Sequence, residues 1–345
     1  MKKFLFLALG VGAASASFAD FFPYDSLIIS RTNGTSSAAA SVDLVGTDFA
    51  GVANGQVWDL TATAGITQSG SATSEGQLNA SNDYLAVPGY VATPGTASVS
   101  SAAGIVRRVA VFDNSGVGSV TTVDLLAGVH AGNNFRSAFA DNLGTVYTAG
   151  GAGGWRENTG GVSNVFGTTT NARVIKTHNG TVYGATGSGT AGIYSLMAGA
   201  QTAVVTTGTG SSPYDFEFYS EGANDFVLVA DDRTTANGGG LQVWQGGSLV
   251  RTFGLGMLRN FSVRNWVDAG VPKITVFGIA NAKDLHALTF DAGDIAGTGA
   301  TWSSSLLNAG ANANFRGVIV VPEPASMIAF GVGLAGLIAR RKRSK

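Results

Sequence analysis

Asn134-Phe135-Arg136-Ser137 opens a short pattern that returns as Asn171-Ala172-Arg173-Val174 and again as Asn314-Phe315-Arg316-Gly317. The first two copies each lead into a turn signal, and the Asn179-Gly180 pair is typical of a tight β-hairpin. A Gly-rich turn and two further apolar runs follow before the next copy. A unit of about 40 residues with four short strands has the size of one propeller blade.

Units with the same rhythm begin near Gly76, Tyr214 and Arg259, whereas the last copy stops after Val321. An incomplete final copy is expected if the C-terminal strand pairs with the N-terminal blade, whose other strands start at Ser26, because this closure removes free sheet edges. We therefore predict an all-β propeller of six four-stranded blades. Seven blades stay open because residues 25–74 show the pattern poorly, and a stacked β-solenoid is the competing architecture.

Composition agrees with an all-β body. The chain of 345 residues contains 50 glycines, no cysteine and only 12% charged residues. Between residues 20 and 321 we find short apolar runs bounded by Gly, Asn or Asp, and no helical periodicity over three turns. The absence of cysteine excludes disulfides and Cys-based metal clusters.

The C-terminal residues 322–345 combine three features: Pro322-Glu323-Pro324, an uncharged apolar stretch at residues 325–339, and a basic end. A helix of 15 residues would span roughly 22 Å, which is short for the hydrocarbon core of a bilayer. We therefore expect a short hydrophobic membrane helix that also includes apolar residues upstream of Pro322. Five cations hold the end of the chain on the cytoplasmic side; they are Arg340, Arg341, Lys342, Arg343 and Lys345.

This tail resembles the PEP-CTERM sorting signal of Gram-negative bacteria, and Pro322, Glu323 and Pro324 match its motif position by position. The resemblance implies export, an anchored intermediate in the inner membrane, and processing by an exosortase-type transpeptidase. It further implies delivery to the cell surface or to the exopolysaccharide matrix. It covers the last 24 residues and implies nothing about the activity of the body.

The N-terminus has the three parts of a secretory signal peptide: Lys2 and Lys3, an apolar run, and small residues up to Ala19. We expect signal peptidase to cut after Ala19, although a cut after Ala16 stays open. The chain then divides into a signal peptide at 1–19, a propeller body at 20–321 and a sorting signal at 322–345.

Charge excludes nucleic-acid binding. Seven of the 21 basic residues lie in the two tails, so the body has a net charge of about −8, and phosphate backbones require clustered Lys and Arg. We expect no metal and no cofactor, because the three histidines, His130, His178 and His286, lie in unrelated segments.

Four groups of residues are candidates for chemistry. Asp231-Asp232-Arg233 and the pair Asp291 and Asp294 could be Ca²⁺ loops, but both lack the spacing of an EF-hand and read better as turns. Asp215 and Glu217 would share a strand face, as glycosidase carboxylates do. Recurring arginines first suggest a structural role in each blade; alternatively, Arg136, Arg173 and Arg316 form a ring in the channel that binds an anionic ligand.

The sequence therefore favours an exported, non-enzymatic propeller that serves as a binding or structural component at the cell surface or in the exopolysaccharide matrix. Two alternatives stay open: an extracellular carbohydrate-active enzyme with carboxylates in the channel, and a surface adhesin that contacts other proteins.

Overall fold

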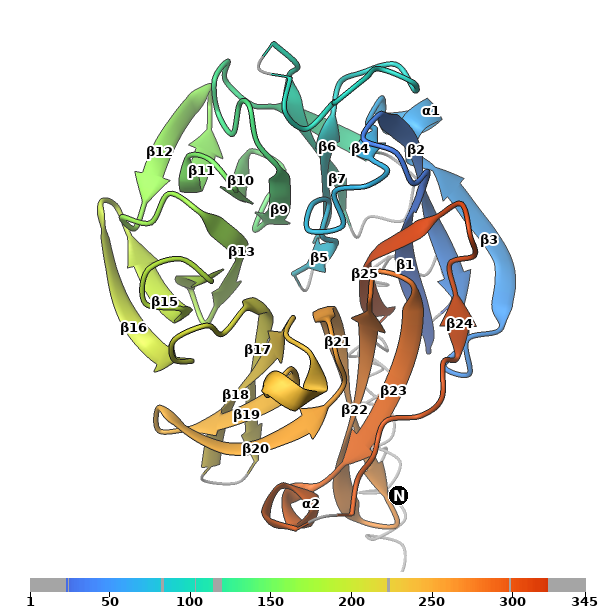
Figure 1. The fold of residues 1–345 in the computed structure, drawn as a ribbon, viewed down its shortest axis with the longest axis vertical. Helices are drawn as coiled ribbons and strands as arrows, with labels where there is room; N and C mark the ends of the chain where they lie inside the picture. Colours follow the sequence, from blue (N-terminus) through green and yellow to red (C-terminus); the bar gives the residue numbers. More distant parts are fainter. Residues whose placement is uncertain are drawn as a thin grey trace, which may run out of the picture.

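Six antiparallel sheets stand radially around a central axis (Figure 1) in the computed structural model, which describes residues 23, 25–81, 84–102, 104–113, 120–221, 224–297 and 299–321. Each sheet is one blade, and its first strand lies nearest the axis. The predicted six-bladed propeller is confirmed, whereas the seven-bladed and solenoid alternatives are wrong, because residues 25–74 supply strands to blade 1 rather than a further blade.

Each blade is built outward from the axis. Blade 1 has β25 (Asn314–Val321), β1 (Ser26–Asn33), β2 (Ala39–Thr47) and β3 (Ala53–Asp59), with β4 (Gln68–Ser69) paired to β2; blade 2 has β5 (Asn79–Ala80), β6 (Tyr84–Tyr90), β7 (Arg107–Asp113) and β8 (Val120–Asp124). Blade 3 has β9 (Phe135–Ala140), β10 (Thr145–Gly150), β11 (Gly154–Thr159) and β12 (Val162–Phe166); blade 4 has β13 (Ala172–His178), β14 (Thr181–Thr186), β15 (Gly192–Met197) and β16 (Ala200–Thr206).

Blade 5 has β17 (Pro213–Glu221), β18 (Asn224–Asp231), β19 (Gly240–Gln245) and β20 (Ser248–Gly254); blade 6 has β21 (Leu258–Asp268), β22 (Val271–Ala280), β23 (Asp284–Phe290) and β24 (Leu307–Asn308). Within the described ranges, three short helices lie in connections: α1 (Leu60–Ala64), η2 (Thr235–Asn237) and α2 (Ala292–Ala296).

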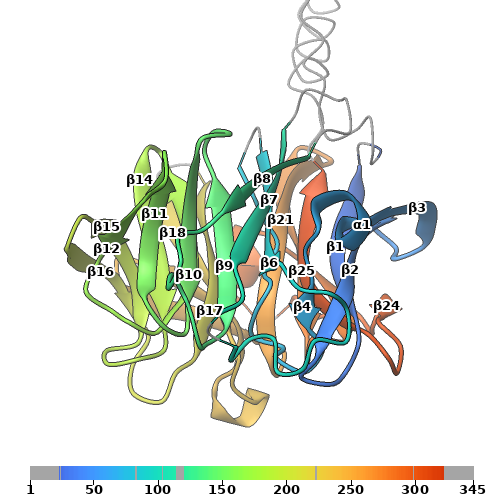
Figure 2. The same cartoon turned by 90° about the horizontal axis from the view of Figure 1, so that it is seen from above.

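The ring closes through the C-terminal strand, as the sequence predicts. β25 pairs antiparallel with β1 in a register that sets Ser26 opposite Val321 and Ile28 opposite Ile319, and Figure 2 shows the two strands side by side. Blade 1 is therefore built from both ends of the described chain. Closure leaves no innermost strand unpaired among the described blades.

The core consists of layers between the blades. Alternate residues of one strand face opposite neighbours: Val174 packs toward blade 5, and Ile175 packs toward blade 3. The described residues form six buried apolar clusters, one for each pair of adjacent blades. Because both faces of each sheet are buried, the strands are rich in Val, Ile, Leu and Phe, and each fully buried side chain contributes about 1.5–3 kcal/mol.

The repeated arginine has a common backbone role. Arg136, Arg173, Arg259 and Arg316 are each skipped by the pairing register of their strand, and Tyr214 is skipped in β17. Each is therefore a bulged residue, which bends its strand and re-aims a side chain. In blade 4, Asn179 and Gly180 have positive φ values of 49° and 75° and form the predicted two-residue turn between β13 and β14.

Candidate functional site

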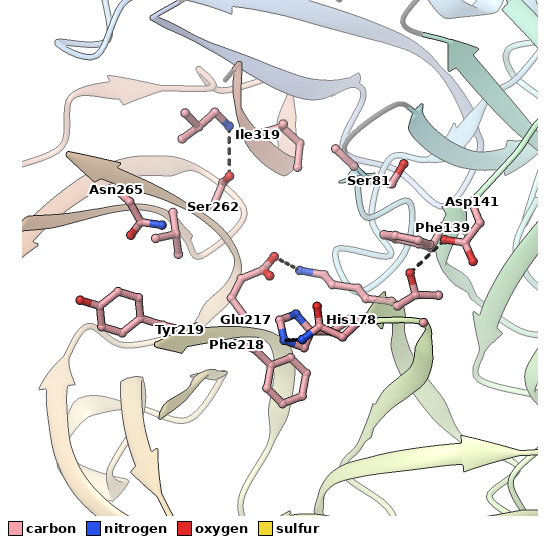
Figure 3. A pocket seen from close by; sticks show the side chains of 17 residues that line it. Ser81, Phe139, Asp141, His178, Glu217, Phe218, Tyr219, Ser262, Asn265 and Ile319 are labelled. Atoms are coloured by element: carbon pink, nitrogen blue, oxygen red, sulfur yellow. Dashed lines mark hydrogen bonds and ion pairs between the residues drawn. The ribbon is translucent and has the colours of Figure 1, made fainter. Parts of the chain in front are cut away.

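The carboxyl ends of the six innermost strands surround a funnel of about 740 Å³ (Figure 3), a volume typical of small-molecule sites. Every blade contributes a residue from one repeat position. In five blades this position lies three residues after the bulge, and in blade 2, which has no bulge, it lies three residues after Gln77. Because each bulge adds one residue, it shifts the alternation of the strand and turns this position toward the axis. The six residues are Ala80, Phe139, Lys176, Glu217, Ser262 and Ile319.

The floor of the funnel holds a buried ion pair. The Nζ of Lys176 lies 2.7 Å from Oδ1 of Asp215 and 2.6 Å from Oε1 of Glu217. Asp215 is fully buried, and it also accepts hydrogen bonds from the backbone N–H of Phe216 at 2.8 Å and from the side-chain amide of Asn260 at 2.9 Å. Lys176 therefore joins blade 4 to blade 5 at the channel wall.

The spacing of Asp215 and Glu217 predicted that they share a strand face, and both carboxylates contact Lys176. Their surroundings differ. The Asp215 side chain has no exposed surface, whereas that of Glu217 is 38% exposed. Burial alone would lower the pKa of Lys176, but the two carboxylates outweigh it and hold the pKa above its usual range. Only Glu217 of this pair can touch a ligand in the funnel.

A third carboxylate, that of Asp141, lies across the funnel (Figure 3). Asp141 accepts a hydrogen bond of 2.9 Å from Oγ1 of Thr177, and burial raises the pKa of its carboxyl above the ordinary value. Among the described residues at the funnel and its floor, the carboxylates of Asp141, Glu217 and the buried Asp215 outnumber the single ammonium of Lys176. The electrostatic character of the funnel is acidic.

Aromatic side chains form one wall. The ring of His178 stacks on Phe218 with centroids 4.5 Å apart and planes inclined by 25°, and the ring of Tyr183 also packs on Phe218, with centroids 4.6 Å apart. Tyr219 and Phe139 also line the funnel (Figure 3). The exposed His178 ring lies beside Thr177 and Asn179, so this wall offers a flat surface next to hydroxyl and amide groups.

The opposite end of the channel is filled by residues 73–79, which we call the channel segment. Its backbone follows β9, because the N–H of Gln77 donates to the carbonyl of Arg136 at 2.8 Å. It also reaches blade 6, where Nε2 of Gln77 donates to the carbonyl of Arg259 at 3.2 Å. Leu78 lies against Gly317 of β25, where any side chain would collide.

The three predicted arginines meet at this filled end. Arg316 is 3% exposed and donates to the carbonyls of Ser69 at 2.7 Å and Gly70 at 3.3 Å. Arg136 donates to the carbonyl of Ala172 in the next blade at 2.9 Å. These contacts to backbone carbonyls are those of the structural role that the repeat suggested.

Arg173 makes a different contact. Its guanidinium stacks on the ring of Tyr214 at 3.9 Å. Within the described part of the chain, its Nε and Nη1, together with Nε of Arg136 and Nη1 of Arg316, are buried without a hydrogen-bond partner. The anion-binding role of these arginines stays a prediction.

Sequence reasoning missed Arg259 and Glu75. Arg259 occupies the same bulge position and pairs with Asp232 at 2.8 Å, so aligning all six openings could have found it. Glu75 is fully buried and accepts a hydrogen bond of 2.8 Å from the hydroxyl of Tyr90. Burial raises its pKa to about 7, against the opposing charge of Arg316.

The candidate Ca²⁺ loops are occupied by internal contacts. Asp231 accepts from Nε of Arg233 at 2.9 Å, and Asp291 and Asp294 form a capping box at α2. Across the described residues there is no cluster of three or more His, Asp or Glu side chains that could hold a metal ion.

Several predicted residues lie outside the described part of the chain: the cleavage site at Ala19, the motif Pro322, Glu323 and Pro324, and the basic residues Arg340, Arg341, Lys342, Arg343 and Lys345. The apolar stretch of the predicted hydrophobic helix, residues 325–339, falls there too. The upstream residues Val318 to Val321, which that helix was predicted to include, are instead part of strand β25 and pair with β1. Within residues 25–321, so far as they are described, no helix has the length and apolar character needed to cross a bilayer.

A family model for the PEP-CTERM protein-sorting motif matches residues 320–343. The chain carries a PEP-CTERM sorting motif. The motif implies export and exosortase sorting to the cell surface, as the sequence predicts, and its match begins at Val320 on the wall of the funnel.

None of the curated proteins matches this chain. Among solved structures, a triple arginine-to-alanine mutant of AofleA from Arthrobotrys oligospora aligns over 88% of this chain and 91% of that chain, with 12% sequence identity and a TM-score of 0.40.

Proposed function

We propose that this PEP-CTERM protein is a binding module of the cell surface or exopolysaccharide matrix, and that its ligand is a neutral or amino-bearing saccharide held in the funnel. In this proposal, residues 1–19 are removed on export. Residues 322–345 hold the propeller at the inner membrane through a short helix and its basic end until an exosortase cuts near Pro322-Glu323-Pro324.

The observation that carries the ligand class is the wall formed by His178 and Phe218 beside an acidic floor. Sugar rings present C–H faces that pack on aromatic planes, while their hydroxyls need amide, hydroxyl and carboxylate partners. Thr177, Asn179 and Asn265 line the funnel with such groups. The excess of carboxylates disfavours acidic polymers because like charges repel at close range.

The test is a binding titration of the chain ending at Val321, which retains every strand of the propeller. Three probes distinguish ligand charge: chito-oligosaccharides, their deacetylated amine forms, and oligogalacturonate. We expect saturable binding of the first two and none of the third. Binding of oligogalacturonate alone would contradict the assignment and would instead support the arginine end as an anion site.

Matched variants locate the site. His178→Ala removes the exposed ring and should weaken binding about tenfold, since stacking on an aromatic ring is worth about 1 kcal/mol or more. His286→Ala is its control, because His286 lies on β23 outside the funnel. Equal affinities for both variants would exclude the funnel wall as the binding surface.

A second candidate function is a carbohydrate-active enzyme, favoured by the presence of Asp141 and Glu217 in one funnel. A raised pKa suits Asp141 to a general acid, and Glu217 would act as nucleophile or base. Two contacts oppose this function, because Lys176 pairs with Glu217 and Thr177 holds Asp141. Release of shorter oligosaccharides that is lost in both Asp141→Asn and Glu217→Gln would establish the enzyme.

A further inference from the structure

Both ends of the described chain leave the propeller at the funnel. β25 runs toward it, with Ile319 and Val320 on the funnel wall, and ends at Val321. Ser26, the first residue of β1, is paired with Val321. The segment that follows Val321 is therefore attached at the rim of the funnel and not at the outer edge of a blade.

The connection to the apolar stretch is short. Three residues, Pro322 to Pro324, separate Val321 from the start of the apolar stretch at Ala325. A chain of three residues spans at most about 10 Å when fully extended. If the apolar stretch lies in a bilayer, the rim of the funnel is held within about that distance of its surface.

The same face of the ring carries exposed apolar side chains at the tips of its hairpins. Val267 is 65% exposed, Val52 63% and Met197 61%. They come from blades 6, 1 and 4, and each lies in or beside a turn at the funnel end of its blade. Leu143, Val162 and Leu249 occupy corresponding places in blades 3 and 5 and are also exposed.

Exposed apolar side chains on this rim lower the free-energy cost of placing the rim against a lipid surface. The neighbouring turns also bear the exposed carboxylates of Asp48, Asp225 and Asp268. These charges oppose penetration into the bilayer, so we expect contact at the surface, imposed by the short connection.

We infer that the funnel faces the membrane while the tail is intact, and that cutting the tail opens the funnel to polymeric ligands. The inference rests on the membrane anchor of the proposed function, and it adds a regulation of the funnel. Sorting and binding are thereby coupled: the precursor is closed to matrix polysaccharide at the inner membrane, and the processed form is open.

Accessibility can be measured without any ligand because the chain contains no cysteine. Asn265→Cys places a thiol at the funnel, where Asn265 is exposed, and Ala236→Cys places one on η2 at the opposite end as the matched control. The full chain is incorporated in phospholipid vesicles, and the rates of reaction with a bulky polyethylene-glycol maleimide are compared.

We expect Asn265→Cys in vesicles to react about tenfold more slowly than Ala236→Cys, which corresponds to a funnel open in about a tenth of the population. Inserting about 20 Gly and Ser residues between Val321 and Pro322 adds a mean reach of about 25 Å. This insertion should restore the rate of Asn265→Cys, and so should cutting the chain after Val321.

Equal rates for the two thiols in vesicles would overturn the inference. A slow Asn265→Cys in the inserted or cut chain would overturn it as well, because the funnel would then be covered by something other than the bilayer. Failure of the full chain to associate with vesicles would remove the anchor and the inference with it. Loss of saccharide binding by the chain ending at Val321 would instead contradict the proposed ligand and leave the labelling result standing.

Discussion

The ammonium of Lys176 in blade 4 and the carboxylate of Asp215 in blade 5 lie 2.7 Å apart with almost no exposed surface. A buried ion pair is costly to form, but removing one partner leaves an uncompensated charge. The pair therefore fixes the position of two adjacent blades at the floor of the funnel.

Lys176→Met should lower the free energy of unfolding by about 3–5 kcal/mol, because Asp215 then stays buried without its counter-ion. Glu217→Gln removes the exposed partner of the same lysine and should cost about 1 kcal/mol or less. Urea denaturation of the two variants provides the measurement. A loss of equal size in both would show that the burial of Asp215 is not the source of the cost.

Stability should depend on His130 at acid pH. His130 is 1% exposed, its Nδ1 lies 2.7 Å from the carbonyl of Ala152, and burial lowers its pKa to about 4, from an ordinary value of 6.5. Between these values the unfolded chain binds more protons than the folded chain. This contribution to stability is therefore complete above pH 6.5 and is lost as pH falls toward 4, by up to about 3 kcal/mol.

His130→Asn tests this, since asparagine tolerates the positive φ of 54° at this position. The difference in unfolding free energy between wild type and variant should shrink as pH falls from 7 to 4. Glu75→Gln is the counterpart with opposite sign: the pKa of Glu75 is raised to about 7 from 4.5, so the wild type should lose stability relative to this variant as pH rises from 4.5 to about 7. If the difference in unfolding free energy between wild type and each variant did not change with pH, the shifted pKa values assigned to His130 and Glu75 would both be contradicted.

A single methyl group added at Gly184 should disrupt the packing between blades 3 and 4. A Cβ there would lie 2.3 Å from Nε1 of Trp155, whose N–H donates to the carbonyl of Val174. Gly184→Ala should therefore destabilise the fold by about 1–3 kcal/mol or more. Gly144→Ala is the control, because its Cβ would meet only Asn142 at an ordinary 3.5 Å. Thermal unfolding of the two variants checks the difference.

The arginines can be separated by role. Arg316→Gln leaves the carbonyls of Ser69 and Gly70 without their donor and should cost about 2–3 kcal/mol. Arg173→Gln loses the stack on Tyr214 and should cost about 1 kcal/mol. If the predicted anion site exists, phosphate should raise the melting temperature of the wild type and not of Arg173→Gln; an equal rise in both would exclude Arg173 from it.

Deleting residues 322–345 should release soluble protein from the membrane fraction, because the deletion removes the apolar stretch and the five cations behind it. Fractionation of cells that express the full and shortened chains is the measurement. Unchanged membrane retention of the shortened chain would show that another part of the protein holds it there.

The sequence alone determined the strands, the repeat, the closure of the propeller ring and the C-terminal sorting motif. Strand and turn signals are local, so the copies that open at Asn134, Asn171 and Asn314 could be found without knowing how the blades meet. An incomplete last copy predicted the pairing of β25 with β1, because a ring has no free edge. The match to the PEP-CTERM motif likewise depends on contiguous residues.

Only the tertiary structure decided the funnel and the filled end of the channel. Lys176 and Asp215 come from different blades, and their separation depends on the position of one whole sheet against the next. A repeat unit begins near Gly76, but the repeat alone does not show that residues 73–79 fill one end of the channel. In five of the six blades the orientation of the innermost strand also depends on a bulge, which shifts the alternation of side chains by one residue and turns the shared repeat position toward the axis.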